Sequence, residues 1–482
     1  MRRGFRNVAA LAAPLFVSAC VTAGEGLDDP LAGFHTVSAR TASVAGKETV
    51  WVQSNAQAKA LADRVTGLVR GKSIGPDVAV QVALLNNKGL QAAYADIGMS
   101  SADLWQESLL VNPRVSVGVM GINAGRTVET AVVGNILALI TRPRRMAVAD
   151  ARFRQAQLRA AEATLQLAAD TRRAWIEAVA AWERVAYLNR AQAAADAASA
   201  LAEKLGQTGA FTKTGQAREH VFYAELAGQT AEARLQARMA KEALTRLMGL
   251  WGYDVDYQVP NALPSLPSNP LARKDIEAQA LRNRVDLDIA KLELEALALS
   301  YGLTEATRYV SDLELVTGAE IEREEEDGET ETKVLLNAEL EFVIPIFDSG
   351  QARMRKAELA YMQAANLLAE RAVNVRSEAR SAYDGYRSTL DIARHYRAAV
   401  VPLRTTIEDE SLLTYNGMIT NTFELLADTR AKINSIMLSL NAKRQFWLAD
   451  VNLGTAVHGG GGSAPAGGGA EAAAADEGGG GH

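Results

Sequence analysis

The sequence predicts a mainly α-helical protein with a small β component, in which long antiparallel helical hairpins are combined with four strands. Two observations indicate this fold class. From Arg144 to Leu205 the chain holds neither glycine nor proline, and a helix of that length would span about 93 Å at 1.5 Å per residue. Short segments in which apolar and polar residues alternate, as in strands, lie just before the two longest helical stretches. A solvated coiled-coil rod remains the alternative for the helices alone.

The N-terminus has the pattern of a bacterial lipoprotein signal peptide. Three arginines precede a short apolar run, and a Val-Ser-Ala segment lies directly before Cys20. A charged region, an apolar core and small residues at a cleavage point are typical of a secretory signal, and small residues before a cysteine resemble a lipobox. We therefore expect residues 1–19 to be removed and Cys20 to carry a covalent lipid, with an ordinary signal peptide as the alternative. Val21 after the cysteine resembles the signal for sorting to the outer membrane.

The mature chain divides into two similar halves. A shift of 208 residues places Tyr383 on Trp175 and Gly417 on Gly209, and further upstream segment 280–287 is similar to segment 83–90. Repeats of this length are typical of duplicated domains. We expect an N-terminal periplasmic segment over 20–75, repeats over 76–250 and 271–455, a proline-rich linker over 251–270 and a disordered tail rich in glycine and alanine over 456–482.

Two pairs of candidate strands lie before the long helices. In the first pair, alternating valines over 115–119 lead to a turn at 123–125, and residues 130–140 return. In the second pair, segment 312–315 precedes segment 336–344. Each strand is about ten residues, the length that a tilted strand needs to cross a membrane. Four strands cannot close a barrel, so a membrane-spanning sheet of this kind would need partner chains.

Acidic residues are concentrated around the second pair. In the last strand Leu336 and Leu340 alternate with Glu339 and Glu341, so apolar and acidic side chains are expected on opposite faces. An acidic run also occupies much of 320–331. We expect this run to form a solvent-exposed loop between the third and fourth strands, with attraction of cations as the alternative.

Composition excludes several classes of function. The 482 residues carry a formal net charge of −6, so a nucleic-acid partner is not expected. A single cysteine excludes internal disulfides and cysteine-based metal clusters. The five histidines have no ligand spacing, and no nucleophile motif or phosphate loop is present. We expect no enzyme activity, no metal site and no cofactor other than the lipid on Cys20.

From about residue 76 to 455 the chain resembles the outer-membrane efflux protein family, the TolC-like channels. The most specific element is Pro345-Ile346-Phe347-Asp348-Ser349-Gly350, which is similar to the strand-to-helix junction of that family. Asn112-Pro113 before the first strand and the glycines at 209 and 417 also fit. The resemblance implies a homotrimer in which four strands per protomer form a shared 12-stranded transmembrane β-barrel and the helices form a periplasmic α-barrel.

The same resemblance implies the function. It is that of a passive exit duct, lipid-anchored in the outer membrane, which receives substrate from a periplasmic adaptor and an inner-membrane pump. Metal ions or small toxic compounds are the expected substrates. A type I protein-secretion duct and a non-transporting periplasmic coiled-coil scaffold lipoprotein are the alternatives. The strand pairs favour the duct, because a scaffold has no use for carboxylates that face a lumen.

The resemblance also assigns roles to residues near the strands. Asp348 is expected to cap the helix into which Gly350 lets the chain turn, just after Pro345. The first half has Ile140-Thr141-Arg142-Pro143 where this junction motif should be, so its strand-to-helix turn is expected to be built differently. The residues expected to face the lumen are Asp312, Glu314, Glu339 and Glu341.

A second group of roles concerns the periplasmic tip. Gly209 and Gly417 are expected to adopt positive φ in the turns between antiparallel helices. Phe423 and Leu426 stand where the family's gate often has aspartates, so a different polar latch is expected. The candidates for this latch are Tyr415, Glu424 and Asp428.

Overall fold

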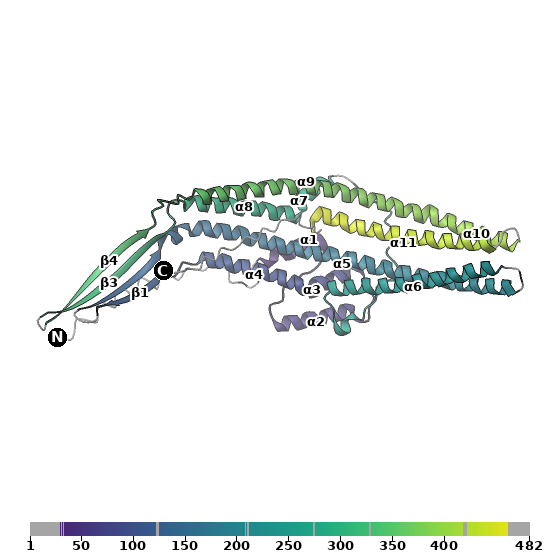
Figure 1. The fold of residues 1–482 in the computed structure, drawn as a ribbon, viewed down its shortest axis with the longest axis horizontal. Coiled ribbons are helices and arrows are strands. Elements are labelled where there is room, and N and C mark those ends of the chain that lie inside the picture. The colour runs from purple at the N-terminus through teal and green to yellow at the C-terminus, as the bar shows by residue number, and fades with distance from the viewer. Residues whose placement is uncertain are drawn as a thin grey trace.

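The protein is an elongated bundle of helices with a β-sheet at one end (Figure 1). This computed structural model describes residues 33–121, 125–207, 209, 212–272, 275–326, 329–417 and 422–460, together with Asp29 and Leu31. The predicted lipid site at Cys20 and most of the predicted C-terminal tail lie outside the described residues. Within the described part, no helix combines the length and the apolar character that a membrane span requires.

From α3 onward, two short helices, two strands, a long helix and a returning helix occur in this order twice along the chain. The first half comprises α1 (Phe34–Ala45), α2 (Asn55–Val69), α3 (Pro76–Asn86), α4 (Lys88–Ser108), β1 (Arg114–Met120), β2 (Gly125–Asn135), α5 (Ile136–Gln207) and α6 (Lys213–Leu247). The second comprises the 3₁₀ turn η1 (Gly252–Val255), α7 (Ile276–Asn283), α8 (Val285–Ala306), β3 (Leu313–Glu326), β4 (Glu329–Phe342), α9 (Gln351–His395), the π-helical turn η2 (Tyr396–Val400), α10 (Val401–Asn416) and α11 (Thr422–His458). The predicted fold class of long helical hairpins with four strands is confirmed for the single chain.

The two halves also agree in local detail. The break between α3 and α4 is at Asn87 (φ −65°, ψ 121°), and the break between α7 and α8 is at Arg284 (φ −71°, ψ 121°). In each case the N–H of the break residue donates to the carbonyl four residues earlier, which ends the first helix. The predicted similarity of segments 83–90 and 280–287 therefore corresponds to one repeated helix–break–helix unit.

The aromatic pair at the 208-residue shift has equivalent contacts as well. Trp175 of α5 donates from Nε1 to the carbonyl of Ile74, 2.9 Å away, just before α3. Tyr383 of α9 donates from its hydroxyl to the carbonyl of Leu271, 3.2 Å away, before α7. Both aromatic rings are buried. Each long helix is thus held to the segment that leads into the short helix of its own half.

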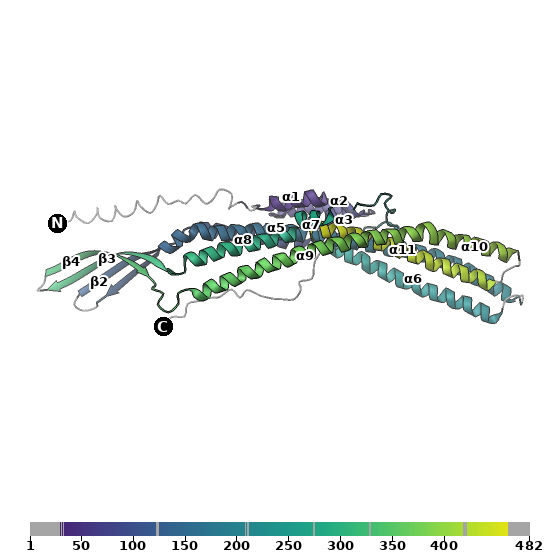
Figure 2. The same ribbon diagram turned by 90° about the horizontal axis from the view of Figure 1, so that it is seen from above.

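The main hydrophobic core lies near the middle of the molecule. Side chains from α2, α3, α5 and α6 meet there, and the predicted linker over 251–270 packs against them through buried Tyr257. Ser73 also forms a parallel bridge with Gln258 of this linker. Figure 2 shows α1 and α2 together on one side of the middle of the bundle. The two ends of the molecule, the sheet and the helical tips, extend away from this packed centre.

Two boundaries differ from the sequence prediction. Strand β2 ends at Asn135 and α5 begins at Ile136, so the predicted strand over 130–140 is wrong in its second part. The apolar run after Asn135 suits a strand or a helix equally, and the Asn135 side chain decides by accepting the N–H of Ala138 at 2.7 Å. Helix α11 continues to His458, so the tail predicted from residue 456 begins too early.

Candidate functional site

The strands form one antiparallel sheet in the order β1-β2-β3-β4, with β1 and β4 at its edges. Residues directly opposite each other in such a sheet share a face, so the register assigns every position. One face, called the apolar face below, carries no ionisable side chain over the Leu313–Ile321 part of β3 and the positions paired with it. Its members are Val115, Val117, Val119, Val128, Thr130, Val132, Gly134, Leu313, Leu315, Thr317, Ala319, Ile321, Val334, Leu336, Ala338, Leu340 and Phe342.

The apolar face is exposed in the single chain. Leu336 is 85% exposed and Val115 is 69% exposed. From Leu313 to Ile321 the face extends about 27 Å along the strand, close to the apolar band about 25 Å tall of membrane barrels. Contiguous exposed apolar surface of this extent marks an interaction surface, because it would otherwise lie in water.

The opposite face, called the acidic face below, carries the carboxylates. The predicted residues Glu314, Glu339 and Glu341 share it, with Glu314 directly opposite Glu341, whereas Asp312 precedes β3 and stands outside the strand pairing. Among the side chains that the structure describes, the ionisable groups of this face are Arg114, Glu129, Glu314, Glu320, Glu322, Lys333, Glu339 and Glu341.

One cation of the acidic face is paired across the sheet. Arg114 of β1 donates to both carboxylate oxygens of Glu314 of β3, at 2.6 Å. The Glu314 side chain is only 14% exposed, whereas Arg114 is 71% exposed. Neither Arg114 nor Glu129 belongs to a sequence motif, and only the register of the strands brings them to this face.

The acidic run over 320–331 lies in strands, so the predicted solvent loop is wrong for most of it. Residues 320–326 belong to β3 and residues 329–331 to β4. The register places Glu322 opposite Lys333 and Glu320 opposite Glu129. Strand propensity depends on the neighbouring strand more than on the residue itself, and the ladders on both sides of β3 outweigh the like charges in this segment.

The strand-to-helix junction of the second half is built around Gly350. This residue has φ +72° and is the N-cap of α9. A Cβ at this position would lie 3.1 Å from the carbonyl oxygen of Arg308, and the Arg308 Nε donates to the carbonyl of Ser349 at 3.1 Å. Asp348 accepts the N–H of Gly350 at 2.8 Å but makes no cap hydrogen bond to α9, so the predicted capping role is wrong. The helix begins after Gly350, and Pro345 lies further back in the connection from β4.

The first-half junction is different, as predicted from the missing motif. Strand β2 passes into α5 without an intervening loop, and Pro143 lies within the helix. Pro143 supplies no N–H to the carbonyl four residues earlier, that of Leu139, and the Arg145 side chain donates to the neighbouring carbonyl of Ala138, 3.2 Å away. The segment 140–143 is therefore helical and forms no separate turn.

The helical tips lie at the opposite end of the molecule from the sheet (Figure 1). Gly209 has φ +73° in the connection between α5 and α6, as predicted. Gly417 has φ −77° as the C-cap of α10, so the predicted positive φ is wrong there. Steric strain from a side chain is therefore expected at Gly209 alone. Gly209→Val is therefore expected to distort the tip, whereas Gly417→Val is not.

The structure distributes the latch candidates along one helical hairpin. Asp428 of α11 accepts a hydrogen bond from the hydroxyl of Ser411 of α10. Glu424 lies in the first turn of α11, and Tyr415 lies in the last turn of α10. A latch formed by these three residues remains a prediction.

A connection between the two hairpins was missed by sequence analysis. Arg430 of α11 donates to Glu219 of α6 at 2.9 Å, and the Arg430 guanidinium lies 4.3 Å from the ring centroid of Phe222. The Glu219 side chain is 5% exposed. Burial raises the pKa of Glu219, and the charge of Arg430 opposes that rise. The partners lie 211 residues apart in sequence, so no local pattern indicates the contact.

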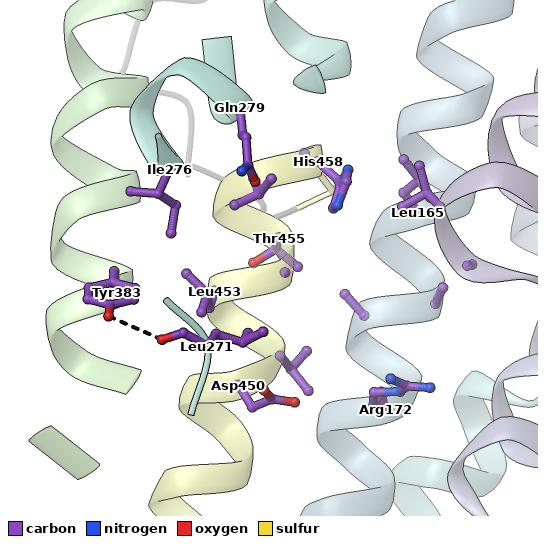
Figure 3. A pocket seen from close by; sticks show the side chains of 18 of the residues that line it. Leu165, Arg172, Leu271, Ile276, Gln279, Tyr383, Asp450, Leu453, Thr455 and His458 are labelled. Atoms are coloured by element: carbon purple, nitrogen blue, oxygen red, sulfur yellow. Dashed lines mark hydrogen bonds between the residues drawn. The ribbon is translucent and has the colours of Figure 1, made fainter. Parts of the chain in front are cut away.

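A cavity of about 530 Å³ is lined by residues of α5, α7, α9 and α11 (Figure 3). Its acidic and basic side chains are Asp450 and His458 of α11 and Arg172 of α5. Burial raises the pKa of Asp450, with the charge of Arg172 opposing it, and burial lowers the pKa of His458. Arg172 already donates to Asp77 at 2.8 Å. Among the described residues, no group of three or more His, Cys, Asp or Glu side chains could hold a metal ion.

Comparison with known proteins identifies the fold. No family model and no curated protein matches the sequence. Among solved structures, CusC, studied for folding and transmembrane channel formation, is 16% identical, with 80% of this chain and 92% of CusC covered at a TM-score of 0.67. The Campylobacter jejuni outer membrane channel CmeC is 18% identical (86% and 89% covered, TM-score 0.64), and the Vibrio cholerae outer membrane protein VceC is 15% identical (80% and 96% covered, TM-score 0.65).

Because these sequence identities are low, the comparisons show the fold alone. The chain has the fold of outer-membrane efflux channels, and the resemblance inferred from the sequence is confirmed at that level.

Proposed function

We propose that this protein is one protomer of an outer-membrane exit duct of the TolC-like family. The observation that supports this most is the two-faced sheet. An exposed face without charge from Leu313 to Ile321 of β3 suits lipid hydrocarbon, and an opposite face with six described carboxylates suits a water-filled lumen. A periplasmic scaffold would bury no apolar sheet face in lipid and would have no use for this arrangement.

The proposed assembly is a homotrimer. The sheet of one chain has two unpaired edges, β1 and β4, and unpaired backbone groups are too costly in hydrocarbon to be left open. Pairing β1 of one protomer with β4 of the next satisfies these groups. Three copies of four strands give the 12-stranded barrel that the family resemblance implies. The helical hairpins of the three chains would then surround a periplasmic tunnel.

The helical tips are the proposed docking point for a periplasmic adaptor, through which an inner-membrane pump would deliver substrate. They are the part of the chain farthest from the sheet (Figure 1), and therefore the part that reaches deepest into the periplasm. Metal ions or small toxic compounds are the proposed substrates. A passage lined by carboxylates favours cations over anions.

Selectivity for cations is the property that tests the duct most simply. Six carboxylates and two cations give the acidic face a formal charge of −4 among its described side chains, and Glu339→Gln with Glu341→Gln halves it. In planar bilayers with a salt gradient, the wild-type reversal potential is expected to show cation selectivity. The double variant should lose about half of that preference in line with its charge. Absence of channels, or anion selectivity in the wild type, would contradict the proposal.

A lipid on Cys20 is the proposed second attachment to the membrane. Gly33 lies against Phe153 and Gln157 of α5, about 26 Å along the helix from Ile136 at 1.5 Å per residue. Thirteen Cα–Cα steps separate Cys20 from Gly33, and they can span about 43–47 Å when fully extended. The chain is therefore long enough for an acylated Cys20 to reach the membrane at the end of the sheet.

Cys20→Ser is expected to abolish acylation while trimers still reach the outer membrane, because the sheet itself holds the protein in lipid. Incorporation of radiolabelled palmitate measures the first effect, and the heat-modifiable trimer in outer-membrane fractions measures the second. Palmitate incorporation equal to that of the wild type would exclude Cys20 as the acylated residue.

A further inference from the structure

Two exposed apolar segments flank the sheet where it joins the helices. The first is the connection from β4 to α9, called the β4–α9 segment below, in which Ile346 is 75% exposed and Phe347 is fully exposed. The second is the connection from α4 to β1, called the α4–β1 segment below, in which Leu110 and Val111 are exposed. One segment follows the edge strand β4 and the other precedes the edge strand β1. In a single chain they therefore lie on opposite edges of the sheet.

The register places both segments at nearly the same level of the sheet. A row of directly opposite residues starts at Arg114, the first residue of β1, and ends at Glu339 in β4. Strand β4 continues from Glu339 for three residues, or about 10 Å, to its end at Phe342. The two edges are three strand spacings apart, about 14 Å. The two segments thus leave each other uncovered within one chain.

The hydrocarbon of a membrane does not account for the exposure of Phe347. The apolar face already extends about 27 Å along β3, close to the height of the apolar band of membrane barrels, and Phe347 lies beyond the end of this face on the helical side (Figure 1). If the helices lie in the periplasm, as the proposed function requires, Phe347 lies below the hydrocarbon. Exposed apolar surface outside lipid marks an interaction site.

Pairing of β4 with β1 of the next protomer brings the two segments together. Strand β4 ends at the helical end of the sheet and β1 begins there, so the two edges meet as an antiparallel pair with both connections on the helical side. Neighbouring strands lie about 4.8 Å apart. The β4–α9 segment of one chain then lies beside the α4–β1 segment of the next.

We propose that these two segments form an apolar contact between protomers in which Phe347 packs on Val111 of the next chain. The inference rests on the proposed trimer, and the occupant of the exposed apolar surface is a second copy of this chain. Burial of an aromatic side chain removes about 150–250 Å² from water, and a closed trimer contains the contact three times. The contact therefore favours the assembled trimer where the barrel joins the helices.

The test is performed in cells on the full-length chain with Cys20→Ser, which removes the only cysteine. Val111→Cys with Phe347→Cys places one thiol in each segment. Treatment with a short bismaleimide is expected to give covalent dimers and trimers in outer-membrane fractions, because each chain offers its two thiols to two different neighbours. Either cysteine alone is expected to give no covalent trimer.

Tyr309→Cys with Phe347→Cys is the matched control. Tyr309 is also exposed, and it precedes β3, the strand next to β4 in the same chain. A link between these two thiols stays within one chain, so no covalent trimer is expected.

Alanine substitutions measure the contact itself. Phe347→Ala and Val111→Ala are each expected to lower the temperature at which the trimer dissociates on a denaturing gel. The double variant is expected to lower it by less than the sum of the two shifts, because substitutions of residues in contact are not additive. Additive shifts, or no shift for either variant, would contradict the inference.

A second cysteine pair separates the failure of this inference from the failure of the proposed trimer. Ser116→Cys with Asn337→Cys links the edge strands themselves, on the acidic face. Covalent trimers from this pair, but none from Val111→Cys with Phe347→Cys, would overturn the inference and indicate that lipid headgroups cover Phe347. Absence of covalent trimers from both pairs would overturn the proposed trimer as well.

Discussion

Arginine at position 336 is expected to prevent the protein from reaching the outer membrane. Leu336 is 85% exposed, and its register partner on the apolar face is Ala319. In a transmembrane barrel, arginine facing lipid near the midplane costs about 2–4 kcal/mol. A trimer carries the substitution three times. We expect Leu336→Arg to leave little or no heat-modifiable trimer in outer-membrane fractions, with the chain degraded or retained in the periplasm.

The adjacent residue supplies the matched control. Asn337 lies at the same depth in β4, but its register partner Gly318 belongs to the acidic face. Asn337→Arg introduces the same side chain toward the proposed lumen and is expected to assemble at a level near that of the wild type. Equal loss of both variants would mean that strand β4 tolerates arginine on neither face. Normal assembly of Leu336→Arg would contradict the assignment of the apolar face to lipid.

Loss of the Arg284 side chain is expected to have the largest effect on stability. Arg284 is 5% exposed and donates from Nε and from a terminal guanidinium nitrogen to the two carboxylate oxygens of Asp286, at 2.9 and 2.8 Å. It also pairs with Glu378 of α9. Arg284→Ala would leave the Asp286 carboxylate, itself 9% exposed, without its cation. Removal of one partner from a buried pair costs about 3–5 kcal/mol.

The measurement is urea unfolding followed by helical circular dichroism. Arg355→Ala is the control, because its pair with Glu358 is exposed on both sides and should contribute less than about 1 kcal/mol. Arg284→Met combined with Asp286→Leu removes both charges, and we expect it to recover most of the lost stability. A loss for Arg284→Ala as small as that for Arg355→Ala would show that the helix break does not depend on this pair.

The parts of the fold that could be predicted from the sequence are those in which apolar and polar residues recur with a clear periodicity or in which residues that break a helix are absent. The alternation around Leu336 and Glu339 specifies one strand face regardless of its neighbours, and the register confirms that these residues lie on opposite faces. Long helices without glycine or proline are equally well specified by local preference. The duplicated pattern further predicts that Trp175 and Tyr383 are equivalent positions, and the structure shows that they make equivalent contacts.

The wrong predictions occur where the local sequence signal is weak or conflicts with the pairing of neighbouring strands. The charge of the acidic run predicts a loop, yet the backbone of its β3 part pairs with β2 and β4. At Gly417 the family resemblance suggested a positive φ, but α10 ends there in a conformation open to any residue. Asp348 lies two residues too early to reach the first turn of α9.

Contacts between distant segments could not be predicted from the sequence at all. Arg284 and Glu378 are 94 residues apart, and Glu219 and Arg430 are 211 residues apart. Charged residues are frequent along exposed helices, and nothing local separates these buried pairs from solvated ones. Only the packing of the helices shows which of these charges lie together.

Covalent linkage of the two sheet edges tests the central claim, a closed barrel of three chains, most directly. Cys20 is the only cysteine, so Cys20→Ser with Ser116→Cys in β1 and Asn337→Cys in β4 places one thiol on each edge strand, both on the acidic face. Cells are treated with a short bismaleimide, and outer-membrane proteins are separated on a denaturing gel. The account predicts covalent dimers and trimers and no larger species, and no trimer when either cysteine is present alone. Chains that remain monomeric in the outer membrane, or products that extend beyond three copies, would contradict a closed trimeric barrel.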